Sequence, residues 1–401
     1  MKKAARFGVI FTVVLVDFLG LSFILPLYPA IADKFGLSAT AITLLSAGYA
    51  LMQFLFSPIL GRLSDRLGRK PILVLSALGT AGSFVLFGLA NSVALLFISR
   101  ILNGIFGSSM AVAQAYMADV TGQEERTQGM GLLGAALGLG LIFGPAMSGF
   151  LGNFGFGVPA YGAAVLSFLN AFLIIFFLKE SLGQELRSIK KIFVSSVHLK
   201  QFSEVLKHPL MSHILATYFL ATFALAAVQN IAILFAEERF HLTLNESGYF
   251  FAFLGVVLVL TQGFWVGRLV KKRGEAWVTV GGMVLMAAGY ILAPLIEFVW
   301  FMVFAAGLMA LGAGFYLPAL NSLISKNASY GEQGEIFGLA QALVGAALIA
   351  GPVFGGGLYD LFGSGSPFFA AAMVTLAALY FAISVLKKLK RLEKKSFFAH
   401  D

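Results

Sequence analysis

Two charged residues stand inside long apolar segments, and both are suited to proton chemistry. Asp17 lies in the apolar segment 7–31 and Arg100 in the segment 93–117. A charge at such depth in a bilayer costs at least about 2.5–3.5 kcal/mol on insertion scales, so these residues usually serve function and face the protein interior. Because burial disfavours the charged form of a carboxyl group, we expect Asp17 to bind and release a proton. We expect Arg100 to tune that proton affinity or to contact substrate; a static buried pair is the alternative.

The composition places these residues in a membrane protein. Of the 401 residues, 59% are hydrophobic and only 12% are charged, and the mean hydropathy is +0.89. A soluble domain carries about 25% charged residues, so this chain has too few to cover a water-facing surface. The sequence has no cysteine and five scattered histidines, and it lacks a G-x4-G-K-[ST] loop. We therefore expect neither an intramembrane enzyme nor an ATP-driven pump, and no metal or cofactor.

Twelve apolar segments are long enough, at about 20 residues each, to cross a bilayer. Since lipid cannot satisfy an exposed backbone, they predict an all-α membrane protein of twelve transmembrane helices. Asp17 interrupts the first segment and equally apolar segments follow it, so we expect a retained helix rather than a cleaved signal. The segments are 7–31, 41–61, 71–90, 93–117, 128–152, 158–178, 210–235, 247–267, 276–295, 298–322, 334–358 and 367–386.

Lysine and arginine residues orient these helices. If both termini are cytoplasmic, 25 of the 28 basic residues fall on the cytoplasmic side, and only Lys34 and Arg239 face outward. This bias follows the positive-inside rule. We expect a multi-pass protein of a bacterial cytoplasmic membrane. The net charge of +9 then reflects topology and contact with lipid rather than nucleic acid.

The chain divides into two related halves. We expect a six-helix bundle over 1–180, a cytoplasmic linker with an amphipathic helix over 181–208, and a second bundle with a basic tail over 209–401. The stretch GRLSDRLGRKP, residues 61–71, is echoed 206 positions later by GRLVKKRGEAW, and Pro145 is followed 207 positions later by Pro352. Two pseudo-symmetric six-helix bundles are the usual plan of secondary transporters, with the substrate site between them near the midplane.

The loop 61–71 carries the first family resemblance. Gly61 and Gly68 permit a sharp turn and close helix approach, and Asp65 could pair with the neighbouring arginines or cap a helix of the other half. G-x-L-S-D-R-x-G-R-K-P resembles the signature loop of the major facilitator superfamily. That resemblance implies a conformational latch formed by Asp65, Arg66 and Arg69, with Asp119 as a partner of the arginines. In the second copy Lys271 replaces the acid, so we expect a weaker latch there.

Segment 128–152 carries the second resemblance. Its glycines permit close helix packing, and its proline removes a backbone hydrogen bond and bends the helix. The pattern is similar to a motif of proton antiporters in the same superfamily, with Ser148 where glycine is usual, and it implies export. The motif residues are Gly131, Gly140, Gly144, Pro145 and Gly149.

Four stretches, residues 15–29, 45–71, 98–121 and 314–325, resemble the tetracycline-efflux branch of the drug–proton antiporters. The stretch SRILNGIFG, which contains Arg100, resembles a motif linked to proton coupling. Acids of those pumps are absent from GSFVLFGLA and GGMVLMAAG, and a histidine is absent from GVVLVLTQG. The resemblance therefore implies a hydrophobic or weakly cationic cargo rather than metal-chelated tetracycline. A flippase of the same fold for lipid or lipid-linked sugar is the alternative.

Polar and aromatic residues on otherwise apolar helices could line a wet central pathway. Each alone is more often a contact between helices than a ligand site, and His213 is expected to be structural. We expect the protein to act as a monomer. The candidate cavity residues are Asn103, Gln114, Tyr218, Phe223, Gln229, Asn230, Gln262, Tyr316, Asn321 and Gln341.

Overall fold

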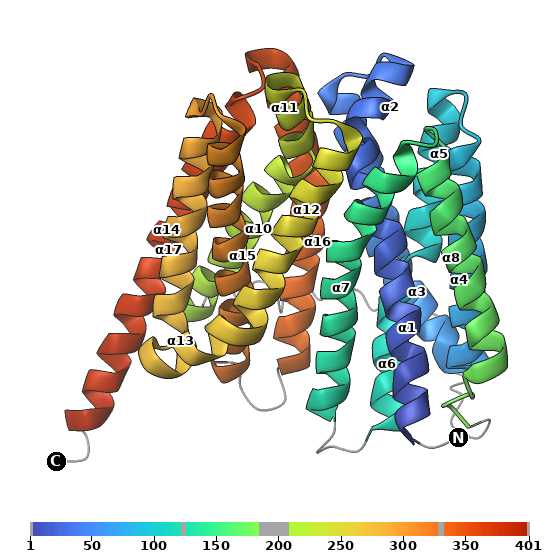
Figure 1. The fold of residues 1–401 in the computed structure, drawn as a ribbon. Helices are drawn as coiled ribbons and strands as arrows, with labels where there is room; N and C mark the ends of the chain where they lie inside the picture. The colour runs from blue at the N-terminus through green and yellow to red at the C-terminus, as the bar shows by residue number, and fades with distance from the viewer. Residues whose placement is uncertain (1–2, 122–125, 184–207, 328–332, 399–401) are drawn as a thin grey trace. The chain divides into compact units, whose positions relative to one another are not determined.

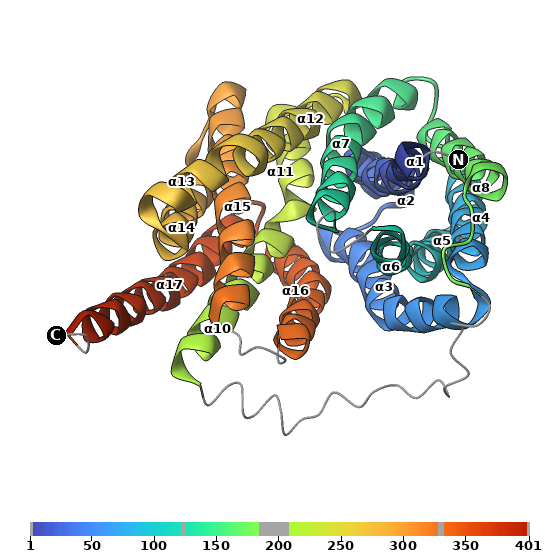
Figure 2. The same cartoon turned by 90° about the horizontal axis from the view of Figure 1, so that it is seen from below.

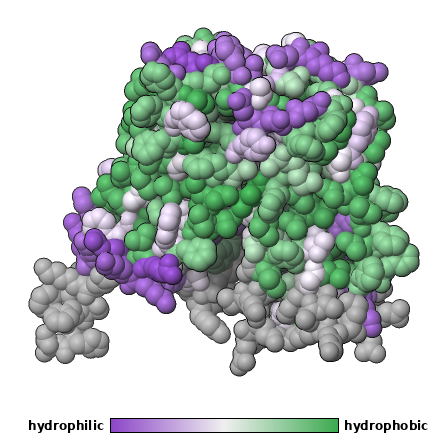
Figure 3. All heavy atoms as spheres, in the orientation of Figure 1, coloured by the Kyte–Doolittle hydropathy of each residue, from purple (hydrophilic) through white to green (hydrophobic). Residues whose placement is uncertain are grey.

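The computed structural model describes residues 3–121, 126–183, 208–327 and 333–398. Regular structure in these ranges is helical, and twelve helices in them are long and apolar enough to cross a membrane. The twelve-helix prediction is confirmed. Figure 3 shows hydrophobic side chains along the middle of the helices and hydrophilic ones near their ends. Such a surface is what lipid around the middle and water at the ends require.

Spatial contacts divide the chain into two units. Unit 1 takes Met1–Phe193 and Ala236–Gly255, and unit 2 takes Val194–Phe235 and Val256–Asp401. The segment 236–255 thus groups with the first unit although it lies in the second half of the sequence.

In the residues that the structure describes, the first half of the chain forms nine helical elements (Figure 1). Helix α1 packs against α7 and α8, and α4 packs against α8 and α5, as the view along the helices also shows (Figure 2). Buried apolar side chains such as Val13, Leu73, Tyr116 and Ile174 form the core among these helices. The elements are α1 (Lys3–Ser22), η1 (Leu25–Leu27), α2 (Tyr28–Phe35), α3 (Ala39–Leu67), α4 (Arg69–Gly88), α5 (Val93–Phe106), α6 (Met110–Val120), α7 (Arg126–Gly152) and α8 (Val158–Phe177).

The second half forms ten helical elements in its described residues. Helix α10 packs against α16 and α17, and α14 packs against α15 and α17. A π-helical turn interrupts the eighth span between α12 and α13. The elements are α10 (Pro209–Gln229), α11 (Ile231–Phe240), α12 (Leu244–Leu260), η3 (Thr261–Trp265), α13 (Val266–Arg273), α14 (Glu275–Leu292), η4 (Ala293–Leu295), α15 (Val299–Asn327), α16 (Gln333–Phe362) and α17 (Ser366–Phe398).

The sequence repeat has a structural counterpart at two glycines. Gly68 joins α3 to α4 with φ 104° and ψ 156°, and Gly274, 206 positions later, joins α13 to α14 with φ 82° and ψ 159°. A positive φ of this kind is strained for residues with a side chain. The turn of the loop 61–71 therefore depends on Gly68. Gly61 lies inside α3, and a side chain there would meet open space within unit 1. The expectation that Gly61 serves the turn is therefore wrong, whereas its role in a close helix approach stays a prediction.

The fourth span differs from its counterpart in the second half. It breaks at Gly107–Ser109, between α5 and α6, whereas α15 runs without interruption from Val299 to Asn327. The break lies in the interior of the span and exposes the amino-terminal end of α6 within unit 1.

Candidate functional site

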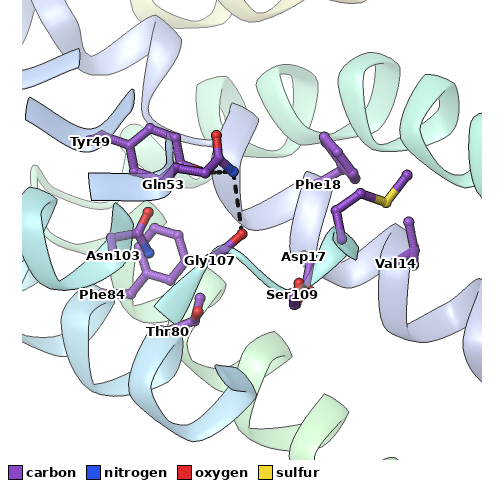
Figure 4. Close-up of a pocket in the computed structure, with 11 residues that line it drawn as sticks. Val14, Asp17, Phe18, Tyr49, Gln53, Thr80, Phe84, Asn103, Gly107 and Ser109 are labelled. Atoms are coloured by element: carbon purple, nitrogen blue, oxygen red, sulfur yellow. Dashed lines mark hydrogen bonds between the residues drawn. The ribbon is translucent and has the colours of Figure 1, made fainter. Parts of the chain in front are cut away.

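Asp17 borders a small cavity inside unit 1. The cavity measures about 30 Å³, which is room for about two water molecules. Figure 4 shows Asp17 and Ser109 together on one side of it, with Tyr49 and Gln53 on another. We call this cavity the Asp17 pocket. It is lined by Val14, Asp17, Phe18, Tyr49, Gln53, Thr80, Phe84, Asn103, Gly107, Ser109 and Met110.

Two neighbouring helices hold the Asp17 carboxylate with hydrogen bonds. The Ser109 hydroxyl, at the start of α6, donates to Oδ2. The Asn170 amide, on α8, donates to Oδ1 at 3.3 Å and to the backbone oxygen of Val13 at 3.0 Å. The acid therefore faces protein and a small cavity rather than lipid.

The break in the fourth span frees Ser109 for this bond. Ser109 is the N-cap residue of α6, but its side chain does not cap the helix. The break itself is tied to α3, because Gln53 Nε2 donates to the Gly107 oxygen at 3.3 Å and to Tyr49 Oη at 3.0 Å. An anion next to a helix start is also favoured by the helix dipole. The local geometry thus stabilises a negative charge at Asp17.

Arg100 is almost fully buried, with 3% of its surface exposed. Its guanidinium lies 4.8 Å from the centre of the Tyr49 ring, and its Nη1 donates to Asn103 Oδ1 at 3.3 Å. Among the described residues, Nε has no hydrogen-bond partner, and no ion pair joins Arg100 to Asp17. Arg100 contacts the Asp17 pocket through Tyr49 and Asn103, which line it.

A charged cluster ties the loop after α3 to the ends of α6 and α8. Arg69 pairs with Asp65 at 2.6 Å and with Asp119 at 3.1 Å, while Arg66 lies partly buried on α3. Glu180 accepts the backbone N–H groups of Arg69 at 2.9 Å and of Lys70 at 3.2 Å. The contacts that the structure gives to Asp65 and Asp119 are thus within unit 1.

In unit 2 an ion pair joins the start of α14 to the end of α15, but the acid and the base have exchanged places relative to Arg69 and Asp119. Glu275 corresponds to Arg69 at an offset of 206, and Lys326 corresponds to Asp119 at an offset of 207. Glu275 and Lys326 form an ion pair, and the Ser322 hydroxyl donates to Glu275 at 2.9 Å. Lys271 stands where Asp65 stands in the first copy. The second loop is nevertheless joined to α15 by the ion pair of Glu275 and Lys326.

The glycine motif of α7 places two helices against its surface. A Cβ on Gly140 would lie 2.6 Å from Phe18 Cβ, and one on Gly144 would meet Ser22 Oγ, so both glycines face α1. A Cβ on Gly149 would lie 2.8 Å from the Leu244 oxygen of α12. Pro145 lies inside α7; Gly131 is in α7 too, but its surroundings fall outside the described side chains.

Ser148 occupies a position next to the end of α1. Its hydroxyl donates to the backbone oxygen of Phe23, just beyond the last residue of α1. Carbonyl groups at a helix end lack partners within the helix. The serine at this position of the motif therefore supplies a hydrogen bond that glycine could not.

The remaining candidate cavity residues belong to other places. Only Asn103 lines the Asp17 pocket. In unit 2, Tyr218 Oη donates to Asn321 Oδ1 at 3.2 Å, and Tyr316 lies 3.5 Å from the Thr222 hydroxyl. Phe223 packs on Phe354, Asn230 is buried, and four glutamines are exposed: Gln114, Gln229, Gln262 and Gln341. His213 contacts Lys388 and the Pro209 oxygen at the start of α10, which fits a structural role.

Four residues of these sites escaped the sequence reasoning. Ser109, Asn170 and Gln53 are polar residues on apolar segments, as are the amides among the predicted cavity residues. Glu180 lies at the end of the predicted first bundle, two residues after the apolar segment 158–178. Only the fold brings Glu180 to the start of α4.

The chain matches known proteins over nearly its whole length. The family model described as Major Facilitator Superfamily matches residues 10–296 and 231–399. The tetracycline resistance protein, class C, of Escherichia coli is 31% identical over 385 residues, which cover 95% of this chain and 96% of that protein. Multidrug resistance protein 2 of Bacillus subtilis (strain 168) is 30% identical over 399 residues, covering 94% and 96%.

Solved structures show the same fold. A bacterial homologue of the human lysosomal transporter Spinster, in an inward-facing and occupied conformation, superimposes with a TM-score of 0.77 at 16% identity and covers 95% of this chain and 96% of its own. The human organic anion transporter MFSD10 (TETRAN) gives a TM-score of 0.72 at 23% identity, covering 95% and 100%.

Proposed function

The chain belongs to the major facilitator superfamily of membrane transporters, and from that membership we propose that it exports small hydrophobic or weakly cationic molecules in exchange for protons. The family and the transporter class predicted from the sequence are confirmed, so the chain is not an enzyme. Its relatives include tetracycline resistance and multidrug resistance proteins. The cargo class is our proposal, and it follows from the absence of the acids and the histidine by which this chain departs from the tetracycline pumps.

The observation that carries proton coupling is the environment of Asp17. The carboxylate borders a cavity with room for water and is held by Ser109 and Asn170. A proton can reach such a group through water, and its charge is supported by hydrogen bonds when the proton leaves. Asp17 is the proton-binding residue in this proposal, and Arg100 holds the Tyr49 side of the pocket.

Transport would proceed by alternating access. Protonation of Asp17 would bias rocking of the bundle 1–180 against the bundle 209–401, because a ligand shifts an equilibrium only through its different affinity for the two states. The cluster of Asp65, Arg66, Arg69 and Asp119 would act as the latch of one end state. Both termini would be cytoplasmic, and a single chain would suffice.

Proton exchange in everted membrane vesicles tests this proposal. Vesicles with an acid interior and a pH-sensitive dye receive hydrophobic or weakly cationic compounds one at a time. We expect some of these compounds to release protons from vesicles that contain the wild-type protein, and none to do so with Asp17→Asn. Compound-driven proton release that persists in Asp17→Asn contradicts the proposal. Uncoupled movement of lipid in reconstituted vesicles would favour the flippase instead.

A further inference from the structure

Asn170 carries a buried amide oxygen without a partner next to the Asp17 carboxylate. The side chain is fully buried, and its Nδ2 donates to Asp17 Oδ1 and to the Val13 oxygen. Both of these neighbours are acceptors, so the amide nitrogen must face them. Its Oδ1 has no hydrogen-bond partner among the described residues. A buried acceptor left unpaired is costly and asks for an explanation.

The explanation lies in what a protonated acid requires. A carboxylate accepts hydrogen bonds only, whereas a carboxyl group must also donate its O–H. An amide is able to serve both forms, because half a turn about its terminal bond exchanges its donor for its acceptor. The unpaired oxygen of Asn170 is then the group that receives the O–H of Asp17.

We propose that Asn170 is a positioning residue that serves both protonation states of Asp17, with its NH₂ group on the carboxylate and its oxygen on the carboxyl. This inference rests on the proposed function of Asp17. When the amide turns, its oxygen gains the O–H of Asp17, while its NH₂ group gives up its bonds to Asp17 Oδ1 and to the Val13 oxygen. The link between α8 and α1 thus changes with each proton that Asp17 binds from the water of the pocket.

The other charged and titratable groups near Asp17 lie on α3 and α5. Tyr49 of α3 and Arg100 of α5, whose guanidinium lies over the Tyr49 ring, are the ionisable residues on that side. In the described residues Ser109, at the start of α6, and Asn170 of α8 bond Asp17, while α7 packs on α1 through the uncharged Gly140 and Gly144. In this proposal the pH dependence of proton exchange belongs to Asp17 and to the groups that bond it.

Asn170→Leu tests the donor half of the proposal. Hydrogen bonds to a charged acceptor are roughly twice as strong as neutral ones, so the carboxylate loses more than the carboxyl when the amide is removed. We expect the midpoint of pH-dependent proton exchange in vesicles to rise by about one pH unit. Asn170→Gln, which keeps the amide, should return the midpoint towards wild type. Asn170→Ala provides the same test without new bulk if the leucine variant does not fold.

Infrared difference spectroscopy of the purified protein tests the acceptor half. The C=O stretch of protonated Asp17 is assigned by its loss in Asp17→Asn. In Asn170→Leu and Asn170→Ala we expect this band to move to higher frequency, because its O–H has lost an acceptor. Ser167→Ala is the matched control, since Ser167 is a buried residue one turn earlier on α8 whose hydroxyl has no partner in the described residues.

The outcomes separate this inference from the proposed function. An unchanged midpoint and an unchanged band in both Asn170 variants overturn the role of Asn170 while wild-type exchange stays intact. A band that moves in Ser109→Ala but not in Asn170→Leu assigns the acceptor to Ser109 and also overturns it. Equal shifts in Ser167→Ala would show a general disturbance of α8. Loss of proton exchange in the wild type itself would instead refute the proposed function.

Discussion

Arg69 and Asp119 form an ion pair, with 3.1 Å between Nε and Oδ2, that joins the start of α4 to the end of α6. The same guanidinium also reaches Asp65 and the Ser64 hydroxyl. Because Arg69 is buried and has several partners, it stabilises unit 1 as well as holding the loop in place.

The first prediction concerns this arginine. Arg69→Gln leaves Asp65 and Asp119 without their cation, and we expect it to lower the stability of the protein by about 2 kcal/mol, a value reduced for the partial exposure of both acids. Denaturant unfolding in detergent measures the change. Arg66→Gln removes a charge from the same loop without these contacts and should cost far less. Equal losses in the two variants would mean that the ion pairs contribute nothing.

The second prediction concerns Glu180. Arg69 begins α4 and Asp119 lies near the end of α6, so both charges oppose the helix dipoles. Glu180 supplies the missing negative charge at the start of α4. We expect Glu180→Gln to destabilise the protein by about 1 kcal/mol at low salt, and by less at high salt. A loss that does not depend on ionic strength would point to its hydrogen bonds alone.

The third prediction concerns the inverted pair of unit 2. Glu275 begins α14 and Lys326 lies in the last turn of α15, so both charges agree with the helix dipoles. Glu275→Lys places two cations together and should lower stability by about 1 kcal/mol. The double variant Glu275→Lys, Lys326→Glu restores the pair but opposes both dipoles, so it should recover only part of the loss. Full recovery would show that the dipoles do not matter here.

The fourth prediction concerns the close contact of α1 and α7. A methyl group on Gly144 would meet Ser22 Oγ and lie 2.9 Å from the Leu19 oxygen. We therefore expect Gly144→Ala to lower stability by about 1–3 kcal/mol, as overpacking does. The matched control is Gly134→Ala in the same helix, where the added carbon meets open space. Thermal unfolding in detergent compares the two, and equal midpoints would contradict the packing argument.

The fifth prediction concerns Arg100. Arg100→Lys keeps the charge but loses the planar stacking on Tyr49 and the fixed geometry of the guanidinium. A cation–π contact is worth about 0.5–2 kcal/mol, so we expect compound-driven proton release to fall about tenfold. Ser99→Ala, which removes a hydroxyl that bonds only within its own helix at Leu96, should leave the rate near wild type. A lysine variant with full activity would show that charge alone suffices.

Much of the fold could be predicted because lipid imposes it. Every transmembrane segment must be apolar and helical, so the twelve spans could be read from composition alone. The repeat at an offset of 206 predicted that the stretches GRLSDRLGRKP and GRLVKKRGEAW are related, and their turns are equivalent at Gly68 and Gly274. Gly61 was assigned to the turn because sequence does not say which glycine of a motif has positive φ.

The site could be predicted only where a residue type is rare in its surroundings. Asp17 and Arg100 stood out as charges in apolar segments, but Ser109 and Asn170 are ordinary polar residues whose importance depends on which atoms they reach. The inverted pair of Glu275 and Lys326 was hidden because its charges do not match the motif of the first half. Such residues can be recognised only when the fold shows where their side chains point and which distant segments they contact.

The interruption of the fourth span in only one repeat makes the two halves non-interchangeable. The position 206 residues after Asp17 is Phe223, and the helix that would have to break beside it, α15, is continuous. A chimera built from two copies of the first half would thus carry two buried acids, each beside a broken helix. A chimera built from two copies of the second half would carry no such acid and no such break. The two related halves therefore share a frame, but in the described residues only the first half places a buried acid beside a broken helix.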